Sequence, residues 1–407
     1  MKMTVSLKTF VASFEKSAYA ALTKDAQDEE RKKIRPTDSC VKISTNKDSV
    51  LFESSSQKMS VFHSMDKDEN MTVDEDGSFC VEASGYLSIL NSIPKDYSLK
   101  ISYEVDKNYG KDSFAGIVQP NGKIITIGSG NKTEKRKGKS DTYPIDDFPK
   151  IDYSGDKVLF SIKAKTLREC VDKVIFATDS TDLSGLLDRV AIYVFEKKLY
   201  FAGTDGKRCA IYSPDKDVEV NCDDQKILID GELLKTSCKV FEGDDKILFY
   251  DCKKGEHVIL SSGKTLVKVC IASEEVKQQF PNVMGILKLV CPTTIVANKS
   301  DLLSSIDFLS KFNAEKSIFH INEGKSQIKV EAARRGEDPE NALVDCETVA
   351  TALSKPVAMS NGFVIDGCKK IKGDMVKLGF SKDEKKIKME STNDTNFVYL
   401  MQVMTAN

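Results

Sequence analysis

The sequence predicts an α+β protein made of three copies of one unit, in which two helices pack on antiparallel sheets. Two pairs of segments repeat the same order of strands and turns: GDDKILFYDCKKGEHVIL from Gly243 with GDMVKLGFSKDEKKIKME from Gly373, and EKKLYFAGT from Glu196 with EGKSQIKVEA from Glu323. KDSVLFESSSQKMSVFH and YSLKISYEVDKNYGKDSFAGIV form a fainter copy near the start. Each copy is itself two half-copies, so the 407 residues hold six half-units.

Two Phe-Pro steps mark the predicted joints between the copies. Phe148-Pro149 and Phe280-Pro281 each precede a new helix or strand. The residue before a proline is disfavoured in a helix, so both steps predict extended connections. We therefore expect domains over residues 1–149, 150–285 and 286–407.

The first copy begins with residues 1–22, MKMTVSLKTFVASFEKSAYAAL, which predict an amphipathic helix. Glu15 and Lys16 interrupt its apolar residues, so we do not expect a signal peptide. The polar residues 24–35 predict a loop or an extension of this helix. Residues 334–351 predict an exposed connection between strands of the third copy.

The second copy has the clearest pattern. Residues 165–178 place apolar side chains on one stripe at helical spacing, which predicts a helix. AIYVFEKKLYFAGTDGKRCAIYS predicts two strands joined at residues 196–198 and a third strand after the turn at Asp205-Gly206. A second helix is expected from Gly231 to Gly243, followed by the strands KILFYDC, HVILSS and TLVKVCIA.

Composition limits the functional classes. Sixty basic and 62 acidic residues give a net charge of −2, which excludes a protein that grips nucleic acid over its whole surface but not one with a single basic face. No apolar run reaches the roughly 18 residues that span a bilayer, so we expect no membrane partner. Eleven scattered cysteines without a CxxC pair predict reduced thiols in a cytosolic compartment.

The motifs of common enzymes are missing from the sequence. His63, His257 and His320 stand far apart, and no GxSxG, HExxH or GxGxxG motif occurs. ITIGSGNKTEKRKGK lacks the spacing of a phosphate-binding loop, and acidic pairs such as Asp146-Asp147 fall in predicted turns. The sequence therefore predicts no catalysis, no metal and no cofactor.

Basic residues recur at equivalent positions of the repeat. Residues 131–140 carry five cations against one carboxylate in a predicted flexible loop, and the predicted helices near residues 165, 235 and 369 are each locally basic. A single such stretch is usually a solvated surface. Recurrence on equivalent helices favours one basic face that contacts phosphates.

Four markers then point to a family. FAGTDGKRCAIYS, TYPIDD before Phe148-Pro149, the second Phe-Pro step and the terminal YLMQVM resemble the bacterial DNA polymerase III beta subunit, or beta sliding clamp, in order and spacing over the whole chain. The resemblance implies three sliding-clamp domains that form half of a six-domain ring, closed by a homodimer. It also implies sequence-independent contact with double-stranded DNA, no catalytic activity, no cofactor and a cytoplasmic, nucleoid-associated location.

The resemblance implies three sets of site residues. A hydrophobic pocket for short linear motifs of DNA polymerase and clamp-loader subunits would comprise Leu187, Thr204, Gly206, Lys207, Arg208, Cys209, Pro281, Ile286, Tyr399, Leu400, Met401, Gln402 and Val403. DNA would be faced by Lys8, Lys16, Lys132, Lys135, Arg136, Lys165, Arg168, Lys173, Lys235, Lys239, Lys369 and Lys370. The dimer interface would contain Lys137, Lys139, Ile306, Phe308 and Phe312.

The sequence also departs from the family's pattern. Lys207 stands where the family often has His, Gln402-Val403 where it often has Pro-Met, and a basic residue near Gly285 is missing. The basic 131–140 segment replaces an apolar edge at the predicted dimer joint, which predicts a weaker dimer than is usual for the family. The alternative function is a clamp-fold interaction scaffold that does not encircle DNA.

Overall fold

The computed structural model describes residues 1–46, 48–105, 120–130, 133–252, 255–312, 315–332, 340–347 and 349–404, apart from the side chains of residues 31, 130 and 133–135. The chain forms two compact units. Unit 1 is Met1–Lys165 with Glu232–Ile271, and unit 2 is Thr166–Gly231 with Ala272–Asn407. This division passes through the predicted second domain, so the bounds 1–149, 150–285 and 286–407 stay a prediction.

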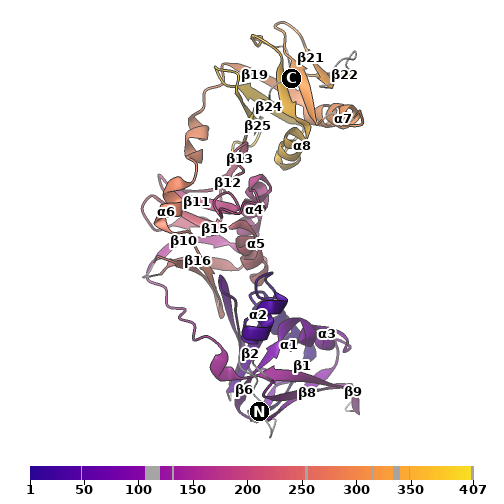
Figure 1. Ribbon diagram of the computed structural model, residues 1–407, viewed down its shortest axis with the longest axis vertical. Helices are drawn as coiled ribbons and strands as arrows, with labels where there is room; N and C mark the ends of the chain where they lie inside the picture. The colour runs from indigo at the N-terminus through magenta and orange to yellow at the C-terminus, as the bar shows by residue number, and fades with distance from the viewer. Residues whose placement is uncertain are drawn as a thin grey trace. The chain divides into compact units, whose positions relative to one another are not determined.

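A strand that runs directly into a helix recurs six times along the chain. The pairs are β1(Lys2–Ser6) with α1(Leu7–Ala18), β6(Gly77–Glu82) with α3(Ala83–Asn91), β10(Val158–Lys163) with α4(Ala164–Val174), β15(Gln225–Asp230) with α5(Gly231–Val240), β19(Thr293–Asn298) with α7(Lys299–Ser310), and β23(Val357–Ser360) with α8(Asn361–Lys370). Figure 1 shows α1 beside α3 and α7 beside α8.

The same backbone hydrogen bond begins five of these helices. The first helical N–H donates to the carbonyl of the residue just before another strand, over 2.8–3.1 Å. The pairs are Leu7 to Tyr97, Ala164 to Asp245, Gly231 to Asp188, Lys299 to Asp374, and Asn361 to Glu315. Because a helix start leaves N–H groups without intrahelical partners, this bond fixes each helix to its sheet. It recurs in both units and supports the predicted half-unit repeat.

Three strands follow each helix, and we call the last of them the third strand of its half-unit. They are β2(Cys40–Asn46), β3(Ser49–Ser55) and β4(Met59–Asp66); β7(Ser98–Val105), β8(Gly122–Gly130) and β9(Thr133–Tyr143); β11(Arg189–Phe195), β12(Lys198–Thr204) and β13(Arg208–Tyr212); β16(Lys246–Asp251), β17(His257–Ser262) and β18(Thr265–Cys270); β20(Lys316–His320), β21(Gln327–Ala332) and β22(Asn341–Asp345); β24(Met375–Phe380), β25(Lys386–Ser391) and β26(Phe397–Gln402).

Shorter elements lie between these groups. They are α2(Glu29–Ile34), η1(Pro36–Ser39), β5(Thr72–Glu75), η2(Ile145–Asp147), η3(Ile175–Ala177), β14(Val218–Val220), α6(Glu274–Gln279) and η4(Val283–Lys288).

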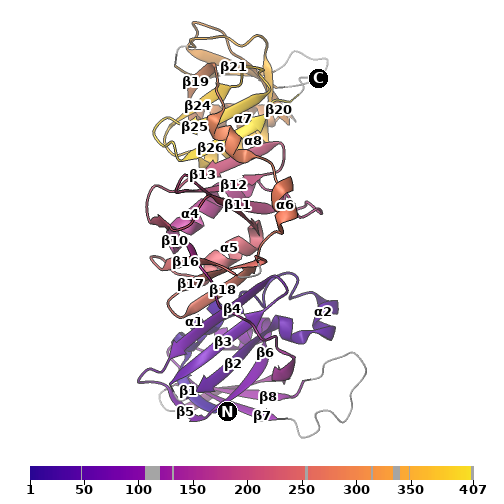
Figure 2. The same cartoon turned by 90° about the vertical axis from the view of Figure 1, so that its left-hand side faces the viewer.

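Third strands also join half-units that are far apart in the sequence. In unit 1 the sheet runs β10-β16-β17-β18-β4-β3-β2-β6-β9-β8-β7-β1-β5, and in unit 2 two sheets run β15-β11-β12-β13-β26-β25-β24-β19 and β22-β21-β20-β23. β18 pairs antiparallel with β4, and β13 pairs antiparallel with β26 (Figure 2). We call such a pairing a third-strand joint.

Apolar side chains of the helices fill the space against the sheets. In unit 1 the ring of Phe52 on β3 lies 5.4 Å from Phe10 of α1, and Phe14 lies 5.3 Å from Tyr86 of α3, measured between ring centroids. All four side chains are fully buried. In unit 2, Gly367 of α8 lets Tyr399 of β26 pack directly against the helix backbone.

Three segments differ from the expected elements. Residues 2–6 form β1 rather than part of the first helix, and the 24–35 segment contains the short helix α2. Residues 133–143 form β9 rather than a loop, because their backbone pairs with β8 from Thr142 to Thr133. Residues 341–345 of the predicted 334–351 connection form β22, while residues 333–339 lie outside the described part of the chain. The polar strand β9 depends on a ladder partner rather than on apolar side chains, which the sequence pattern does not reveal.

Replacing Gly367 with alanine should lower stability, although alanine favours helices by about 1 kcal/mol. A Cβ at this position would lie 2.6 Å from Cδ1 of Tyr399, so either the ring or the helix must move. We expect a net loss of about 1–3 kcal/mol. Gly362→Ala is the matched control in the same helix, because its nearest neighbour would lie 3.9 Å away. Urea unfolding compares the two variants, and equal midpoints would contradict the packing described.

Candidate functional site

The turn between β12 and β13 is held by its own side chains. The Asp205 Oδ1 atom accepts hydrogen bonds from the N–H groups of Lys207 at 2.9 Å and Arg208 at 2.8 Å. Thr204 Oγ1 donates to the Arg208 carbonyl at 2.6 Å and accepts from the N–H of Gly206 at 3.1 Å. Gly206 has φ +83°, a conformation that favours glycine. The turn is therefore a fixed feature, with Lys207 exposed at its tip.

A second ordered loop places Leu187 beside this turn. The Asp182 carboxylate accepts the N–H of Leu187 at 2.7 Å and of Leu186 at 3.0 Å, and the Ser184 hydroxyl also donates to it. These bonds, that of Leu187 first, lower the pKa of Asp182 to about 2. A Cβ placed on Gly206 would lie 3.8 Å from Cδ1 of Leu187. Sequence reasoning missed Asp182; the run of Asp and Ser around it is the signal that could have shown it.

The Arg208 side chain is the centre of a structural network. Its Nε donates to Asp205 Oδ2 at 2.9 Å, its Nη1 to Asp366 Oδ2 at 2.6 Å, and its Nη2 to the Phe176 carbonyl at 2.8 Å. The guanidinium also lies 4.6 Å from the ring centroid of Phe363. Only 14% of the side chain is exposed. Arg208 therefore joins β13 to α8 and η3, and we assign it a supporting role instead of direct ligand contact.

The last strand, β26, is buried on both faces from Phe397 to Met401 and exposed at Gln402. Tyr399 and Met401 are fully buried, so the prediction that they line a ligand pocket needs correction: the strand period turns them toward α8 and the core. Leu400 is 8% exposed on the opposite face. Gln402 is exposed, and its Nε2 donates to the Gly206 carbonyl at 3.0 Å. Val403 is half-buried.

An apolar cluster contains three of the predicted pocket residues. Cys209 and Leu400 lie in it, with Ile286 packed against its edge. Phe280, which the sequence marked only as part of a joint, and Val283, which it did not mark, belong to the same cluster, whereas Pro281 is exposed. The predicted set therefore divides between this cluster and the Gly206 turn with Leu187.

Most of the described cations predicted to face DNA lie on exposed helix surfaces. Lys8 is exposed on α1, Lys165 and Arg168 on α4, Lys235 and Lys239 on α5, and Lys369 at the end of α8. Lys16 pairs with Glu242 at 2.8 Å, and Lys370 pairs with Asp172 at 2.7 Å. Lys132 and the side chain of Lys135 lie outside the described residues, and Arg136 is exposed on β9.

Lys173 is a correction to the predicted DNA-facing set. The residue is 8% exposed, its Nζ donates to the Lys370 carbonyl, and it lies 5.3 Å from the ring centroid of Phe397. Burial lowers its pKa. The ammonium group of Lys173 therefore connects α4 to the end of α8 and to β26. In this structure a phosphate cannot reach it.

Two of the six repeated helices carry no basic residue on their exposed stripes. α3 exposes Ser84, Gly85, Ser88 and Asn91, and α7 exposes Ser300, Ser304, Asp307 and Phe308. Just past α7, Lys311 pairs with Asp307 at 3.2 Å. The basic character predicted for the helices therefore belongs to α1, α4, α5 and α8.

The residues predicted for the dimer interface lie on two different elements. Lys137 and Lys139 are exposed on β9. Ile306 is fully buried in unit 2, so its place in an interface needs correction: it faces the sheet side of α7. Phe308 is 49% exposed, and its ring centroid lies 5.2 Å from that of Phe312. Leu343 of β22, which sequence reasoning missed, is 54% exposed.

Among the described strands, β9 and β22 each have an edge that lacks a strand partner over most of its length. β9 pairs with β8 along its length but with β6 only at Thr142 and Tyr143. β22 is the last strand of its sheet and pairs with β21 alone among the described strands. These are the two third strands that form no third-strand joint within the described part of the chain.

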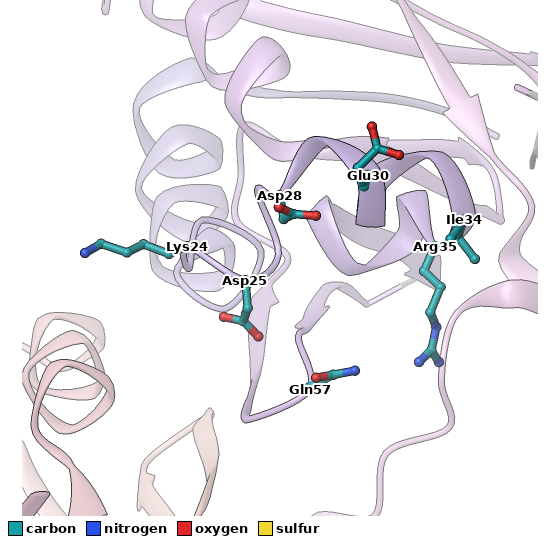
Figure 3. Close-up of a pocket in the computed structure, with 7 residues that line it drawn as sticks. All are labelled: Lys24, Asp25, Asp28, Glu30, Ile34, Arg35 and Gln57. Atoms are coloured by element: carbon teal, nitrogen blue, oxygen red, sulfur yellow. The ribbon is translucent and has the colours of Figure 1, made fainter. Parts of the chain in front are cut away.

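A cavity of about 610 Å³ lies beside α2 (Figure 3). Lys24 and Arg35 stand on opposite sides of it, and Gln57 lies between them. Its lining also includes three carboxylates, those of Asp25, Asp28 and Glu30. The mixture of charges favours no single kind of ion.

Histidines and cysteines take structural positions. His63 shares a hydrogen bond of 2.9 Å with Thr265, and burial, then the charge of Lys16, lowers its pKa to about 4. His320 lies 2.7 Å from Glu331. The eleven cysteines are free thiols. Within the described ranges, no group of three or more His, Cys, Asp or Glu side chains is placed to hold a metal ion. None of the described helices is long and apolar enough to cross a membrane.

Comparison with known proteins shows the fold. The chain superimposes on the DNA polymerase III beta subunit from Pseudomonas aeruginosa with a TM-score of 0.81 and 15% identity, covering 99% of this chain and 100% of that one. A sliding clamp from Bacillus subtilis gives 0.79 at 16% identity, covering 100% and 99%. A putative DNA polymerase III beta subunit from Eubacterium rectale gives 0.78 at 18%, covering 100% of both chains.

These likenesses confirm the predicted sliding-clamp fold over the whole chain. No protein-family model matches the sequence, and no curated protein matches it.

Arg208→Gln should destabilise unit 2, because it leaves the Asp366 and Asp205 carboxylates without their shared cation. We expect a loss of about 2–4 kcal/mol, as for other partly buried charge pairs that lose one member. Lys207→Gln, at the exposed neighbouring position, is the control and should change stability little. Thermal unfolding measures both. An Arg208→Gln protein as stable as the control would contradict the supporting role.

Proposed function

We propose that this protein is a DNA sliding clamp, a non-catalytic processivity factor that encircles duplex DNA as a homodimer. The observation that carries the proposal is the third-strand joint. The chain makes this joint twice, at β4–β18 and β13–β26, and among its described strands leaves β9 and β22 with open edges. An open edge is a template for pairing with another chain. The β9 edge of each copy can therefore pair with the β22 edge of the other copy.

The two open edges are complementary in charge. β9 exposes Arg136, Lys137 and Lys139, whereas β22 exposes Asp345. Glu347, also exposed, follows β22 directly. Pairing repeated twice between two copies gives a closed ring with two equivalent joints. A joint built on exposed charges is weakened by salt, which fits the weaker dimer predicted from the sequence.

The exposed cations of the helices suit a DNA backbone. Lys8, Lys165, Lys235 and Lys239 lie on helices that occupy equivalent places in the repeat. Lysine contacts to phosphates do not depend on the base sequence, so a ring lined by these lysines can move along any duplex. Retention on DNA is then topological, and individual contacts can stay weak. Nothing in this function calls for catalysis.

The surface formed by Leu187, the Gly206 turn and the Cys209–Ile286–Leu400 cluster would hold short motifs of DNA polymerase and clamp-loader subunits. Leu187 and Ile286 are half-buried, so they offer apolar contact without being locked in the core. Arg208, Tyr399 and Met401 support this surface from behind. Lys207 and Gln402, which depart from the family's pattern, are exposed at its rim and would set the motif preference.

Replacing Lys165, Lys235, Lys239 and Lys369 with glutamine should weaken binding to a short DNA duplex. If each contacts one phosphate, the slope of log affinity against log salt should fall by about 0.9 per lost contact. The control replaces three exposed strand lysines, Lys123, Lys198 and Lys386, together with the exposed Lys382 in the β24–β25 turn, and has the same net charge. Fluorescence anisotropy over a salt series measures both. Equal slopes in the two variants would refute the assignment of the helices.

Leu343→Pro should prevent dimer formation while each copy stays folded. The N–H groups of Ala342, Val344 and Cys346 point toward β21, as the bond from Cys346 to Ser326 shows, so the N–H of Leu343 points to the open edge. Proline removes that donor and is tolerated on edge strands.

Leu343→Thr, which keeps the N–H, is the matched control. Sedimentation velocity at micromolar and nanomolar concentrations should show a wild-type dimer that dissociates on dilution, a proline variant that is monomeric throughout, and a threonine variant that dimerises. A proline variant that dimerises like the wild type would contradict the β9–β22 joint.

A further inference from the structure

A second cavity of unit 1, of about 170 Å³, is lined by basic and hydroxyl side chains at the turn between β3 and β4. Its polar lining includes Ser55, Ser60, Lys58, Lys150, His257 and Lys268. None of its described lining residues carries a carboxylate. In this it differs from the cavity beside α2, where three carboxylates face two cations (Figure 3).

The register of four strands brings these side chains together. Ser55 of β3 lies opposite Ser60 of β4, and Ser60 lies opposite Lys268 of β18. Lys268 lies opposite Ile259 of β17, two residues from His257. Side chains at directly opposed positions, and at positions two apart, share one face of a sheet. Ser55, Ser60, Lys268 and His257 therefore lie together on the face of the sheet opposite Phe52 and α1.

The serine hydroxyls line this cavity and bond to each other. Ser55 and Ser60 are 5% and 8% exposed, and their Oγ atoms lie 2.9 Å apart. The Ser55 hydroxyl is also placed to donate to the Ser56 carbonyl at 3.3 Å. Because a hydroxyl has one proton, a ligand in the cavity can receive that of Ser60 when Ser55 donates to Ser60.

The cavity is also electropositive. Burial lowers the pKa of His257, the positive charge of Lys268 lowers it further, and Glu256 only partly opposes this. The Nζ of Lys268 donates to the Asp152 carbonyl at 3.0 Å, and an ammonium group has three donors, so two remain for a ligand. The three lysines approach the cavity from β18, from the β3–β4 turn and from the segment after Pro149.

We propose that this cavity binds a phosphoryl group, either as inorganic phosphate or as the phosphate of a nucleotide. Donors that converge from several directions match the oxygens of a tetrahedral anion. A volume of about 170 Å³ is several times the roughly 30 Å³ of one water molecule. The site shares no residue with the exposed helix cations or with the Leu187 surface, so its ligand does not compete with the proposed DNA or peptide contacts for the same residues.

The chain's three histidines provide the test. NMR of the histidine rings follows a titration with phosphate at constant ionic strength, with chloride and ATP as parallel arms. We expect the His257 resonance alone to move and to saturate, with its pKa rising because a bound anion favours the imidazolium. His63 and His320 lie elsewhere and should not move. Saturation with phosphate and ATP supports the proposal, whereas saturation by ATP alone identifies a nucleotide as the source.

Lys150→Gln and Lys268→Gln should each weaken phosphate binding about tenfold, the loss expected for one charge-assisted hydrogen bond. Lys24→Gln, in the cavity beside α2, is the matched control and should bind as the wild type does. Circular dichroism confirms that the variants are folded. The proposal is overturned if His257 shows no saturable change, if chloride produces the same change, or if the Lys24 variant loses as much affinity as the other two.

Discussion

Two antiparallel ladders, β4–β18 and β13–β26, hold together segments that lie about two hundred residues apart in the sequence. Each ladder satisfies the backbone groups of two strands that would otherwise end their sheets, and an unpaired edge invites association with other chains. The rest of the structure depends on this need to pair the edge strands. The two ladders join half-units within each unit. Among the described strands, β9 and β22 are the third strands for which the chain provides no such partner.

Charged residues near these ladders serve two different purposes. Arg208 and Lys173 are withdrawn from solvent. Arg208 donates a hydrogen bond to Asp366, and Lys173 lies over the ring of Phe397. They stabilise the contact of α8 with the strands and α4 of unit 2. Lys165, Lys235 and Lys239 stay on exposed helix faces, where water screens them and a polyanion can reach them. Basic composition alone does not separate the two groups, because the difference lies in what surrounds each side chain.

Periodicity predicted the helices and hairpins of the second copy well, since the apolar stripe of α4 and the Asp205-Gly206 turn are local features. The sequence could not show that residues 133–143 pair with β8, because that strand is polar and its partner supplies the stability. It also could not assign the residues of β26 to a face: Leu400 and Met401 are adjacent, apolar and both buried, and only the sheet decides which one packs into the cluster with Cys209. Arg208 was predicted to contact a bound peptide because its structural partner, Asp366, is remote in the sequence and could not be foreseen.

Encirclement is the central claim, and topology tests it most directly. The protein is mixed with nicked circular DNA, the joints between copies are closed with an amine-reactive cross-linker, and the complexes are washed in high salt. The DNA in one half of the sample is then cut at a single site, which makes it linear. A ring predicts protein that stays on the circles and leaves the linear molecules. Equal retention on circles and on linear DNA, or none on either after dimers have been cross-linked, would contradict the account.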